Sequence, residues 1–344
     1  MNDAVSAATG RLVAFGEIML RLSPPGRELL LQSPRLDVWV AGAEANLVTA
    51  LACLGHDTAM VSALPDSDLG QGALVQLRGR GVDCTGIRRG GERIGLYYVI
   101  PGAGPRATEV IYDRAHSAFA EAPVDGWDWP QLLAGADRLH LSGITPALGP
   151  EPARAALAAA EAASAAGVPV SFDGNWRGKL WERWNSDPRG VLTQLVAHAD
   201  LMFGNHRDIA LLLGRPFSGD GEHRRREAAE AAFEAFPRLQ LIASTARTVV
   251  GSDHHRLAAR VDARDRAAQT GERDLTGVVD RIGGGDAFAA GVLDALRRGE
   301  TIDVAAETGL ALAVLKHTLP GDASLFGRRD LDAFMTEGAG DVRR

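Results

Sequence analysis

The chain has 344 residues, 46% of them hydrophobic and 24% charged, which are ordinary values for a globular protein with a substantial core. Its net charge of −7 argues against nucleic acid as the main partner, so an anionic ligand would need a local group of arginines. No stretch approaches the roughly 18 uncharged apolar residues of a membrane span, and the first ten residues do not resemble a signal peptide. We therefore expect a cytoplasmic protein without a membrane partner, in which Cys53 and Cys84 stay reduced.

Strands and helices alternate along most of the sequence. A strand at 12–15 is followed by a helix at 43–54, a strand at 59–63 and a helix at 69–80. Farther along, strands are predicted at 138–142, 168–172, 201–203 and 239–243, with helices at 151–166, 191–197 and 227–236 between them. This alternation predicts an α/β domain in which a mostly parallel sheet is covered by helices on both faces.

The segment 94–112 interrupts this alternation. Two β-rich runs, 96–100 and 109–112, are joined by the turn-forming residues 101–105 and predict a hairpin. Together with 18–40, this hairpin could form a small lid sheet over a ligand. The three tyrosines of the protein, Tyr97, Tyr98 and Tyr112, all fall in it. Because side chains alternate along a strand, only one of Tyr97 and Tyr98 can face the ligand, and we favour Tyr97.

A glycine-rich segment, Gly283-Gly284-Gly285-Asp286, directly precedes a predicted helix that ends at Gly299. Glycines at a helix N-terminus let backbone N–H groups converge on an anion, which the helix dipole also favours. An aspartate in the first turn can then act as a base toward a hydroxyl held beside that anion. Taken alone, these residues are more typical of a turn in which Asp286 caps the helix.

Two better-known phosphate-binding signatures are missing. No Gly-x-Gly-x-x-Gly follows a strand, which argues against a dinucleotide-dependent dehydrogenase. The segment 174–180 superficially resembles a P-loop, but it has three spacer residues instead of four. It also has Leu180 where Mg²⁺ chemistry requires serine or threonine.

Seven patterns, one of which contains the glycine-rich segment, occur in order along the chain: 16–25, Gly42-Ala43-Glu44-Ala45-Asn46, 113–118, 139–145, Asp173-Gly174-Asn175-Trp176-Arg177, 279–286 and 316–322. Together they resemble the ribokinase (PfkB-type) family of carbohydrate kinases, and most closely its 2-keto-3-deoxygluconate kinases, over roughly residues 12–335. The resemblance implies a ribokinase-like three-layer α/β/α domain over residues 11–337. It also implies a β lid formed by about 18–40 and 94–114, with loose termini at 1–10 and 338–344.

The resemblance also implies roles for individual residues. Asp286 would be the catalytic base, and the amides of Gly283, Gly284 and Gly285 would stabilise the transferring phosphoryl group. The sugar would be surrounded by Gly42, Ala43, Asn46, Tyr97, Tyr112, Arg114, Arg177 and Asp322. The nucleotide would contact Asn175, Asn205, Ser244, Thr245 and Arg247, and Mg²⁺ would accompany ATP, with Asp208 as its candidate ligand.

The implied reaction is phosphorylation of 2-keto-3-deoxy-D-gluconate by ATP at its primary (6-) hydroxyl, which gives 2-keto-3-deoxy-6-phosphogluconate and ADP. Arg114 and Arg177 suit a carboxylate, because guanidinium binds it in a planar, bidentate geometry. The alternatives are a kinase for an epimeric keto-deoxy sugar acid or for a neutral ketose such as fructose. A sugar sensor without catalysis is a third hypothesis, which the intact Asp286 and its glycines disfavour.

The sequence departs from the family pattern at two positions. Asn205-His206-Arg207-Asp208 stands where Asn-x-x-Glu is usual, with a shorter carboxylate. A nucleotide loop that often contains Lys-x-Gly reads Ala243–Thr248 here, and His254-His255 beyond it is expected in a solvated loop. By analogy with the family, we also expect a homodimer that forms through the lid.

Overall fold

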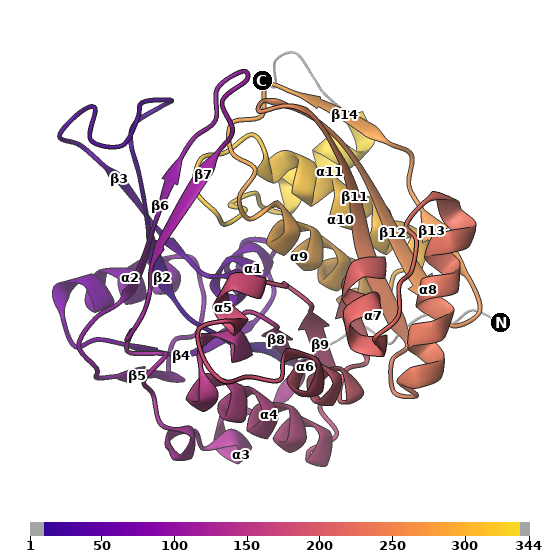
Figure 1. Cartoon of the computed structure of the whole chain (residues 1–344), viewed down its shortest axis with the longest axis horizontal. Helices are drawn as coiled ribbons and strands as arrows, with labels where there is room; N and C mark the ends of the chain where they lie inside the picture. Colours follow the sequence, from indigo (N-terminus) through magenta and orange to yellow (C-terminus); the bar gives the residue numbers. More distant parts are fainter. Residues whose placement is uncertain (1–9, 338–344) are drawn as a thin grey trace.

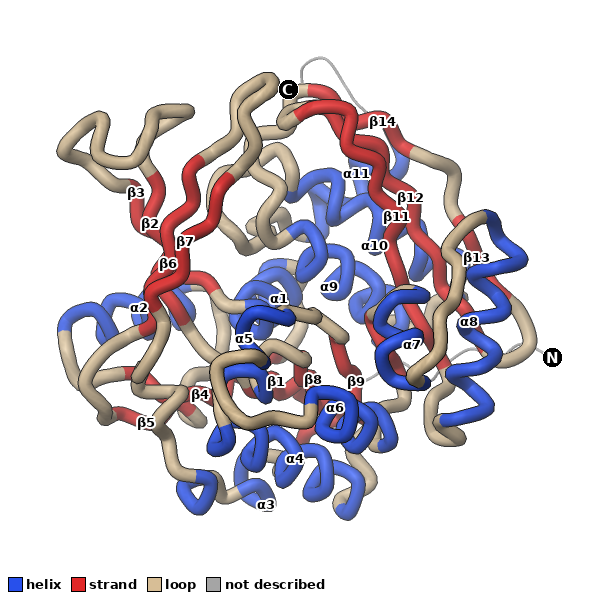
Figure 2. Tube along the Cα trace, viewed as in Figure 1, coloured by secondary structure: helices blue, strands red, loops and turns tan. Residues whose placement is uncertain are grey.

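Residues 10–337 are described by the computed structural model, which contains a large and a small sheet (Figures 1 and 2). The segments 1–10 and 338–344, expected to be loose, lie outside the described residues except for Gly10. None of the described helices has the length and apolar character needed to cross a membrane.

The large sheet has ten strands and is parallel over most of its width. In spatial order it runs β13 (Ala267–Gln269), β12 (His254–Ala263), β11 (Leu241–Gly251), β10 (Leu201–Phe203), β9 (Val170–Asp173), β8 (Ala136–Ser142), β1 (Arg11–Phe15), β4 (Thr58–Leu64) and β5 (Ile87–Arg89), and β14 (Arg273–Thr276) pairs with β12. The pairs from β11 through β10, β9, β8, β1 and β4 to β5 are parallel, whereas β12 is antiparallel to β11. The predicted mostly parallel sheet is therefore confirmed.

Helices cover both faces of this sheet, each over its own hydrophobic core. One core is built with α1 (Ala43–Cys53), α2 (Asp68–Gly79), α9 (Gly284–Arg297), α10 (Ile302–Lys316) and α11 (Arg328–Glu337). The other is built with α3 (Trp129–Leu132), α4 (Pro150–Ala165), α5 (Gly178–Trp181), α6 (Pro188–Ala197), α7 (His206–Leu213) and α8 (Gly221–Ala235). The result is the three-layer α/β/α arrangement.

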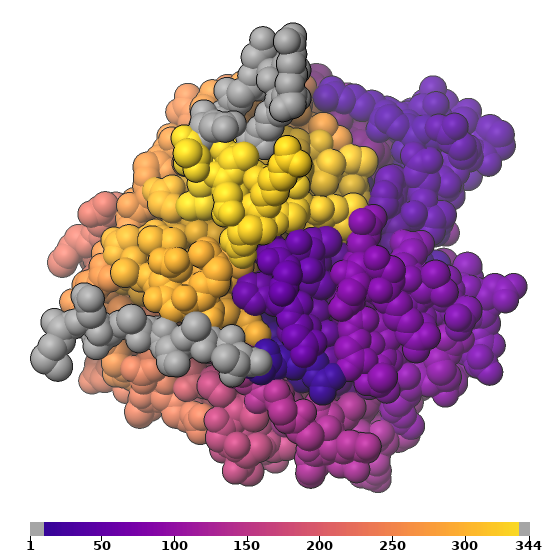
Figure 3. Space-filling model, turned by 180° about the vertical axis from the view of Figure 1, so that it is seen from behind, coloured from indigo at the N-terminus to yellow at the C-terminus, as the bar shows by residue number. Residues whose placement is uncertain are grey.

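The small sheet is the predicted lid. Its strand order is β3 (Asp37–Ala41), β2 (Met19–Ser23), β6 (Gly95–Ile100) and β7 (Glu109–Asp113). The predicted hairpin is the β6–β7 pair, in which Tyr97 lies opposite Tyr112. In Figure 1 the lid stands at the left, and Arg27 of its β2–β3 loop pairs with Asp253 of the β11–β12 turn at 3.5 Å. Seen from behind, it projects beside the C-terminal helices (Figure 3).

Candidate active site

The carboxyl ends of the parallel strands and the inner face of the lid enclose one large cavity of about 940 Å³. Ligands of open α/β sheets bind at this edge, where the chain leaves one strand and enters the next connection. All the candidate residues line the cavity: Gly42, Ala43, Asn46, Tyr97, Tyr112, Arg114, Asn175, Arg177, Asn205, Asp208, Ser244, Thr245, Arg247, Gly283, Gly284, Gly285, Asp286 and Asp322. The fold thus brings together residues that are spread over most of the sequence.

The glycine-rich segment forms the N-terminus of α9. Gly283 adopts φ +80°, and a side chain there would begin 1.8 Å from the carbonyl oxygen of Asp322, so only glycine fits. No side chain caps the helix, which leaves first-turn N–H groups such as that of the exposed Gly285 available to a ligand. This arrangement fits an anion site and excludes the alternative in which Asp286 caps the helix.

The carboxylate of Asp286 lies beside the start of α1. Its Oδ2 accepts a hydrogen bond of 2.7 Å from Nδ2 of Asn46. Burial raises the pKa of Asp286 to about 8; the Asn46 bond opposes this shift, and Asp173, Asp322 and Glu44 add to it. The side chain is enclosed by protein but keeps part of its surface open to the cavity. A carboxyl with a pKa near neutrality is suited to proton transfer.

At the lid, Asp322 is held by two side chains. The hydroxyl of Tyr97 donates to its Oδ2, and Nη1 of Arg21 donates to its Oδ1 at 2.7 Å. Arg21 also forms an ion pair of 2.5 Å with Asp280, and both the arginine and the two carboxylates are nearly inaccessible to solvent. The prediction that Tyr97 rather than Tyr98 faces the cavity is thereby supported, and the Tyr97 ring stacks on that of Tyr112.

Arg114 is paired as well. It is 4% exposed, and its Nε donates to Oε2 of Glu17 at 2.8 Å while Nη2 pairs with the same oxygen. Ser117 donates to the other oxygen of Glu17 at 2.5 Å. Glu17 therefore fixes the orientation of Arg114, whose Nη1 is not used in these bonds.

Two carboxylates lie together where β9 and β10 end. Asp208 closes a capping box at the start of α7 by accepting from the Asn205 amide at 2.8 Å. Burial and the neighbouring Asp208 raise the pKa of Asp173 to about 7, and burial also raises the pKa of Asp208. A divalent cation would relieve this repulsion, and oxygen donors suit Mg²⁺. No group of three or more acidic, histidine or cysteine side chains that could hold a metal ion occurs in the described residues.

Four arginines on the cavity wall, Arg177, Arg207, Arg247 and Arg281, make no ion pair with any described residue. Burial lowers the pKa of Arg247, and the like charge of Arg281 lowers it further. Like positive charges that face a cavity favour binding of anions. The cavity therefore has the local group of arginines that an anionic ligand would need.

Comparison with known proteins identifies the family. The family model described as pfkB family carbohydrate kinase matches residues 9–325. The chain belongs to this family. The predicted resemblance is thus confirmed, and the protein is an enzyme that phosphorylates sugars. PfkB kinases use ATP, typically with Mg²⁺.

Similar proteins cover nearly the whole pfkB kinase. The 2-dehydro-3-deoxygalactonokinase of Haloferax volcanii is 34% identical over 98% of this chain and 100% of its own length. The crystal structure of the 2-dehydro-3-deoxygluconokinase of Thermotoga maritima has a TM-score of 0.90 and 34% identity, and the match covers 95% of this chain and 100% of that one. The 2-dehydro-3-deoxygluconokinase of Bacillus subtilis is 27% identical, over 94% of this chain and 95% of its own.

Two expectations about the nucleotide end of this kinase are wrong. Ala243–Thr248 is not a loop but part of β11, which continues to Gly251 and forms a long hairpin with β12. His254 and His255 are strand residues of β12, not a solvated loop. His255 is 1% exposed and packs edge-on against His317, with 6.0 Å between ring centres.

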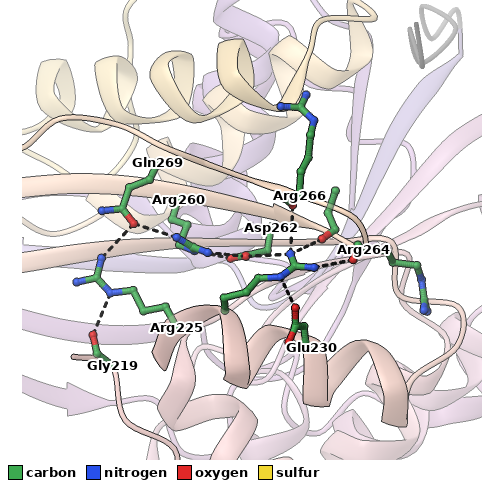
Figure 4. Close-up of polar contacts among 10 residues, drawn as sticks. Gly219, Arg225, Glu230, Arg260, Asp262, Arg264, Arg266 and Gln269 are labelled. Carbon is green, nitrogen blue, oxygen red and sulfur yellow. Dashed lines mark hydrogen bonds and ion pairs between the residues drawn. The ribbon is translucent and has the colours of Figure 1, made fainter. Parts of the chain in front are cut away.

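A smaller cavity of about 240 Å³ adjoins the main one and is lined by residues of α7, α8, β11 and β12. Arg260 of β12 donates to Asp262 at 2.7 Å and to Gln269 at 3.1 Å, and Arg225 of α8 reaches the same Gln269 at 3.3 Å (Figure 4). Because these side chains bond one another, we assign this network to the anchoring of α8 on the sheet.

Sequence reasoning missed several polar residues around the cavity: Glu17, Arg21, Glu44, Asp173, Asp280, Arg281 and Lys316. Glu44 accepts hydrogen bonds from Ser142 at 2.6 Å and Thr145 at 3.2 Å, and thus holds the loop after β8. Asp173 was detectable, since it ends a predicted strand at the ligand edge. Arg21 and Asp280 had no such signal, because their pairing joins segments distant in the sequence.

Proposed function

We propose that this pfkB kinase transfers the γ-phosphate of ATP to the primary (6-) hydroxyl of 2-keto-3-deoxy-D-gluconate. The observation that carries the proposal is the position of Asp286, which lines one cavity with the uncapped N-terminus of α9 and the lid residues Tyr97 and Arg114. Asp286 would accept the hydroxyl proton while the hydroxyl oxygen forms a bond to the γ-phosphorus. The bond from that phosphorus to the bridging oxygen breaks, and ADP leaves.

The nucleotide would occupy the cavity end formed by β11 and α7. Asn175, Asn205, Ser244, Thr245 and Arg247 would contact it there, and all five line the cavity. Asp208, together with Asp173, would hold the Mg²⁺ that accompanies ATP, whose charge offsets that of the phosphates. The amides of Gly283, Gly284 and Gly285 would face the transferring phosphoryl group, because first-turn N–H groups and the helix dipole favour negative charge.

The sugar acid would lie between Asp286 and the lid. Gly42, Ala43 and Asn46 line this end at the start of α1, and Asp322 and Tyr97 offer hydrogen-bond partners to hydroxyl groups. Arg177 is exposed and has no ion-pair partner among the described residues, so its guanidinium is available for the carboxylate. A neutral ketose would leave this charge unused, which favours an acid over fructose.

The epimer 2-keto-3-deoxy-D-galactonate is a second candidate. The Haloferax volcanii relative that matches nearly the whole chain is named as a kinase for this compound. The two acids differ only in the orientation of one hydroxyl, and a binding site that hydrogen-bonds a hydroxyl can distinguish such isomers.

An ADP-release assay with both acids and fructose, in the presence of ATP or GTP, tests the proposal. We expect kcat/KM to be highest for 2-keto-3-deoxy-D-gluconate with ATP and about 10- to 150-fold lower for fructose, since a lost charged hydrogen bond costs about 1.5–3 kcal/mol. Higher kcat/KM for the galactonate epimer would establish the second candidate. Good turnover of fructose and none of either acid would overturn both.

A variant pair tests the carboxylate site. Arg177→Met should raise KM for the sugar acid about 10-fold or more, because a charged hydrogen bond is lost. Lys179→Met removes the same charge from the neighbouring helix α5 but does not alter a cavity residue. Equal effects of the two substitutions on KM would refute the assignment of Arg177.

A further inference from the structure

A lysine side chain is completely buried beneath the glycine-rich segment. Lys316 is the last residue of α10 and is 0% exposed. Its Nζ donates to the carbonyl oxygens of Asp280 at 3.2 Å and Leu319 at 3.3 Å. Burial of an ammonium group costs several kcal/mol of folding free energy, so an apolar residue of similar size would make the fold more stable here. The charge is therefore expected to serve the function.

The choice of lysine is unusual for this chain. Of 37 basic residues only Lys179 and Lys316 are lysines, and the other basic positions, including all four free cavity cations, are arginines. An ammonium group is a compact point charge with three donors, whereas guanidinium is a wide planar fork. Two carbonyl oxygens on adjacent loops suit the compact group.

The two carbonyls belong to the segments that shape the anion site. Asp280 precedes the glycine-rich segment, and its Oδ1 accepts from the amide of Ile282 at 3.0 Å. Leu319 lies in the loop that leads to Asp322, whose carbonyl oxygen faces Gly283. The amide of Gly321 donates to Oδ2 of Asp280 at 3.2 Å. The hydrogen bonds of Lys316 thus link the two segments to each other.

The cluster around this lysine balances charge. Arg21 pairs with the carboxylates of Asp280 and Asp322, and these two acids act on Lys316 as well. Without the ammonium, two buried carboxylates would face a single guanidinium. Burial lowers the pKa of Lys316, and the carboxylates of Asp280, Asp322 and Asp286 oppose this shift.

We propose that Lys316 is a positioning residue that serves as a built-in monovalent cation: its ammonium occupies a carbonyl site beneath Gly283–Gly285 and keeps their amides in place for phosphoryl transfer. K⁺ and ammonium groups both bind backbone carbonyls, so the tethered cation makes a diffusible one unnecessary. This inference rests on the proposed function only in assigning the anion site to these amides, and it does not depend on which sugar is phosphorylated.

The first test uses the unmodified enzyme. Its turnover should change less than twofold when tetramethylammonium chloride is replaced by NaCl, KCl or NH₄Cl at equal ionic strength. A strong, saturable activation by K⁺ would overturn the proposal, because it would show that the carbonyl site needs a free ion.

The second test empties the site. Lys316→Ala should lower kcat at least 100-fold in tetramethylammonium chloride. Replacing this salt by NH₄Cl, methylammonium chloride or KCl should raise the kcat of the variant at least 10-fold. Lys316→Met fills the same space without charge and should not be restored. A folded Lys316→Ala enzyme with full activity, or one that no cation restores, would contradict the proposal.

Thermal unfolding gives a readout that does not require turnover. Small cations should raise the melting temperature of Lys316→Ala above its value in tetramethylammonium chloride, and the unmodified enzyme should show no such difference. Lys179→Ala is the matched control and should behave like the unmodified enzyme in both assays. If no sugar is turned over, the proposed substrate is wrong. Cation-selective stabilisation of Lys316→Ala would still support the proposed role of Lys316. If small cations do not stabilise this variant, the proposed role of Lys316 is wrong.

Discussion

At the scale of single residues, the surroundings of Asp286 determine how the enzyme responds to pH. Its carboxyl is enclosed among other acids and has one neutral donor, Asn46, so protonation is favoured up to a pKa of about 8 in the free protein. Because only the ionised form can accept a proton, kcat/KM should rise with pH across this range.

The pH profile of kcat/KM tests this environment. We expect an acidic limb with a midpoint between about 7 and 8, since Asp173, with a pKa of about 7, titrates in the same cavity. Asn46→Ala should move the limb to higher pH, because the lost hydrogen bond stabilises the ionised form. A profile that is flat from pH 6 to 9 would contradict the assignment of Asp286 as base.

Removal of the carboxylate tests the same residue by a different route. Asp286→Asn should lower kcat about 10²–10⁴-fold, the range that general bases contribute, and should leave sugar-acid binding nearly intact. Binding can be followed by isothermal titration calorimetry. Retention of full turnover would rule out Asp286 as the base.

The same substitution should also stabilise the fold. The pKa of Asp286 is raised from 3.8 to about 8 in the folded chain, so ionisation favours the unfolded state increasingly between these pH values. Asp286→Asn should therefore be more stable than the unmodified protein at pH 8, by about 1–2 kcal/mol after allowance for the surface open to the cavity. The difference should disappear near pH 4, as measured by urea denaturation. Equal stability at pH 8 would mean that the pKa is not raised.

At the scale of elements, the lid is fastened to the body by Tyr97, which also lines the cavity, and by the buried Arg21. Tyr97 of β6 and Arg21 of β2 lie opposite each other in neighbouring strands, and both bind Asp322 from the loop after α10. The contacts that fasten the lid therefore include a residue that lines the cavity.

Substitutions of the two adjacent tyrosines of β6 test which face of the lid contacts the sugar. Tyr97→Phe should raise KM for the sugar acid about 5- to 10-fold, the cost of one hydrogen bond of about 1 kcal/mol or slightly more. Tyr98→Phe is the matched control on the opposite face and should leave KM unchanged. The same steady-state assay serves both variants. A larger effect on KM at Tyr98 would mean that Tyr98, and not Tyr97, faces the sugar.

Local patterns predicted most elements but not those built by long-range pairing. The strand at 12–15 and the helix at 43–54 were found because apolar periodicity and terminal glycines mark them. The β11–β12 hairpin was missed, since exposed residues such as Val249 and Val250 follow the predicted strand 239–243 without a sheet-like alternation. The helix predicted at 227–236 begins at Gly221, because its first turns are charged and carry no apolar pattern.

The site was predictable to the extent that short motifs mark it. The residues named from the sequence all line the cavity, and most of them belong to a motif at a strand end or helix start. Glu17 and Lys316 act through Arg114 and through backbone carbonyls. Such roles depend on which segments the fold brings together, which no local spacing reveals.

At the scale of the whole molecule, the outer face of the lid carries an apolar row. Register places Val38, Leu22, Tyr98 and Ile111 side by side across the four strands, on the face opposite to Tyr97. Val38 is 48% exposed and Ile111 43%. Adjacent exposed apolar side chains favour association, which supports the proposal of a homodimer through the lid.

Light scattering coupled to size-exclusion chromatography tests this arrangement. The unmodified protein should elute with twice the mass of the chain, and Val38→Asp combined with Ile111→Asp should elute as a monomer, because charge in an apolar interface is unfavourable. Val249→Asp alters an apolar residue of β11 that is more exposed than either lid residue, and it should not change the mass. A monomeric unmodified protein would refute the lid dimer.

The sequence distance between bonded partners in the site has a consequence for synthesis. Asn46 and Asp286 are 240 residues apart, and Arg21 and Asp322 are 301 apart. A chain still growing on the ribosome contains the lid long before it contains Asp286, Lys316 or the loop that fastens the lid. No partial chain can therefore assemble the reaction centre, and the nascent enzyme cannot consume ATP until synthesis is almost complete.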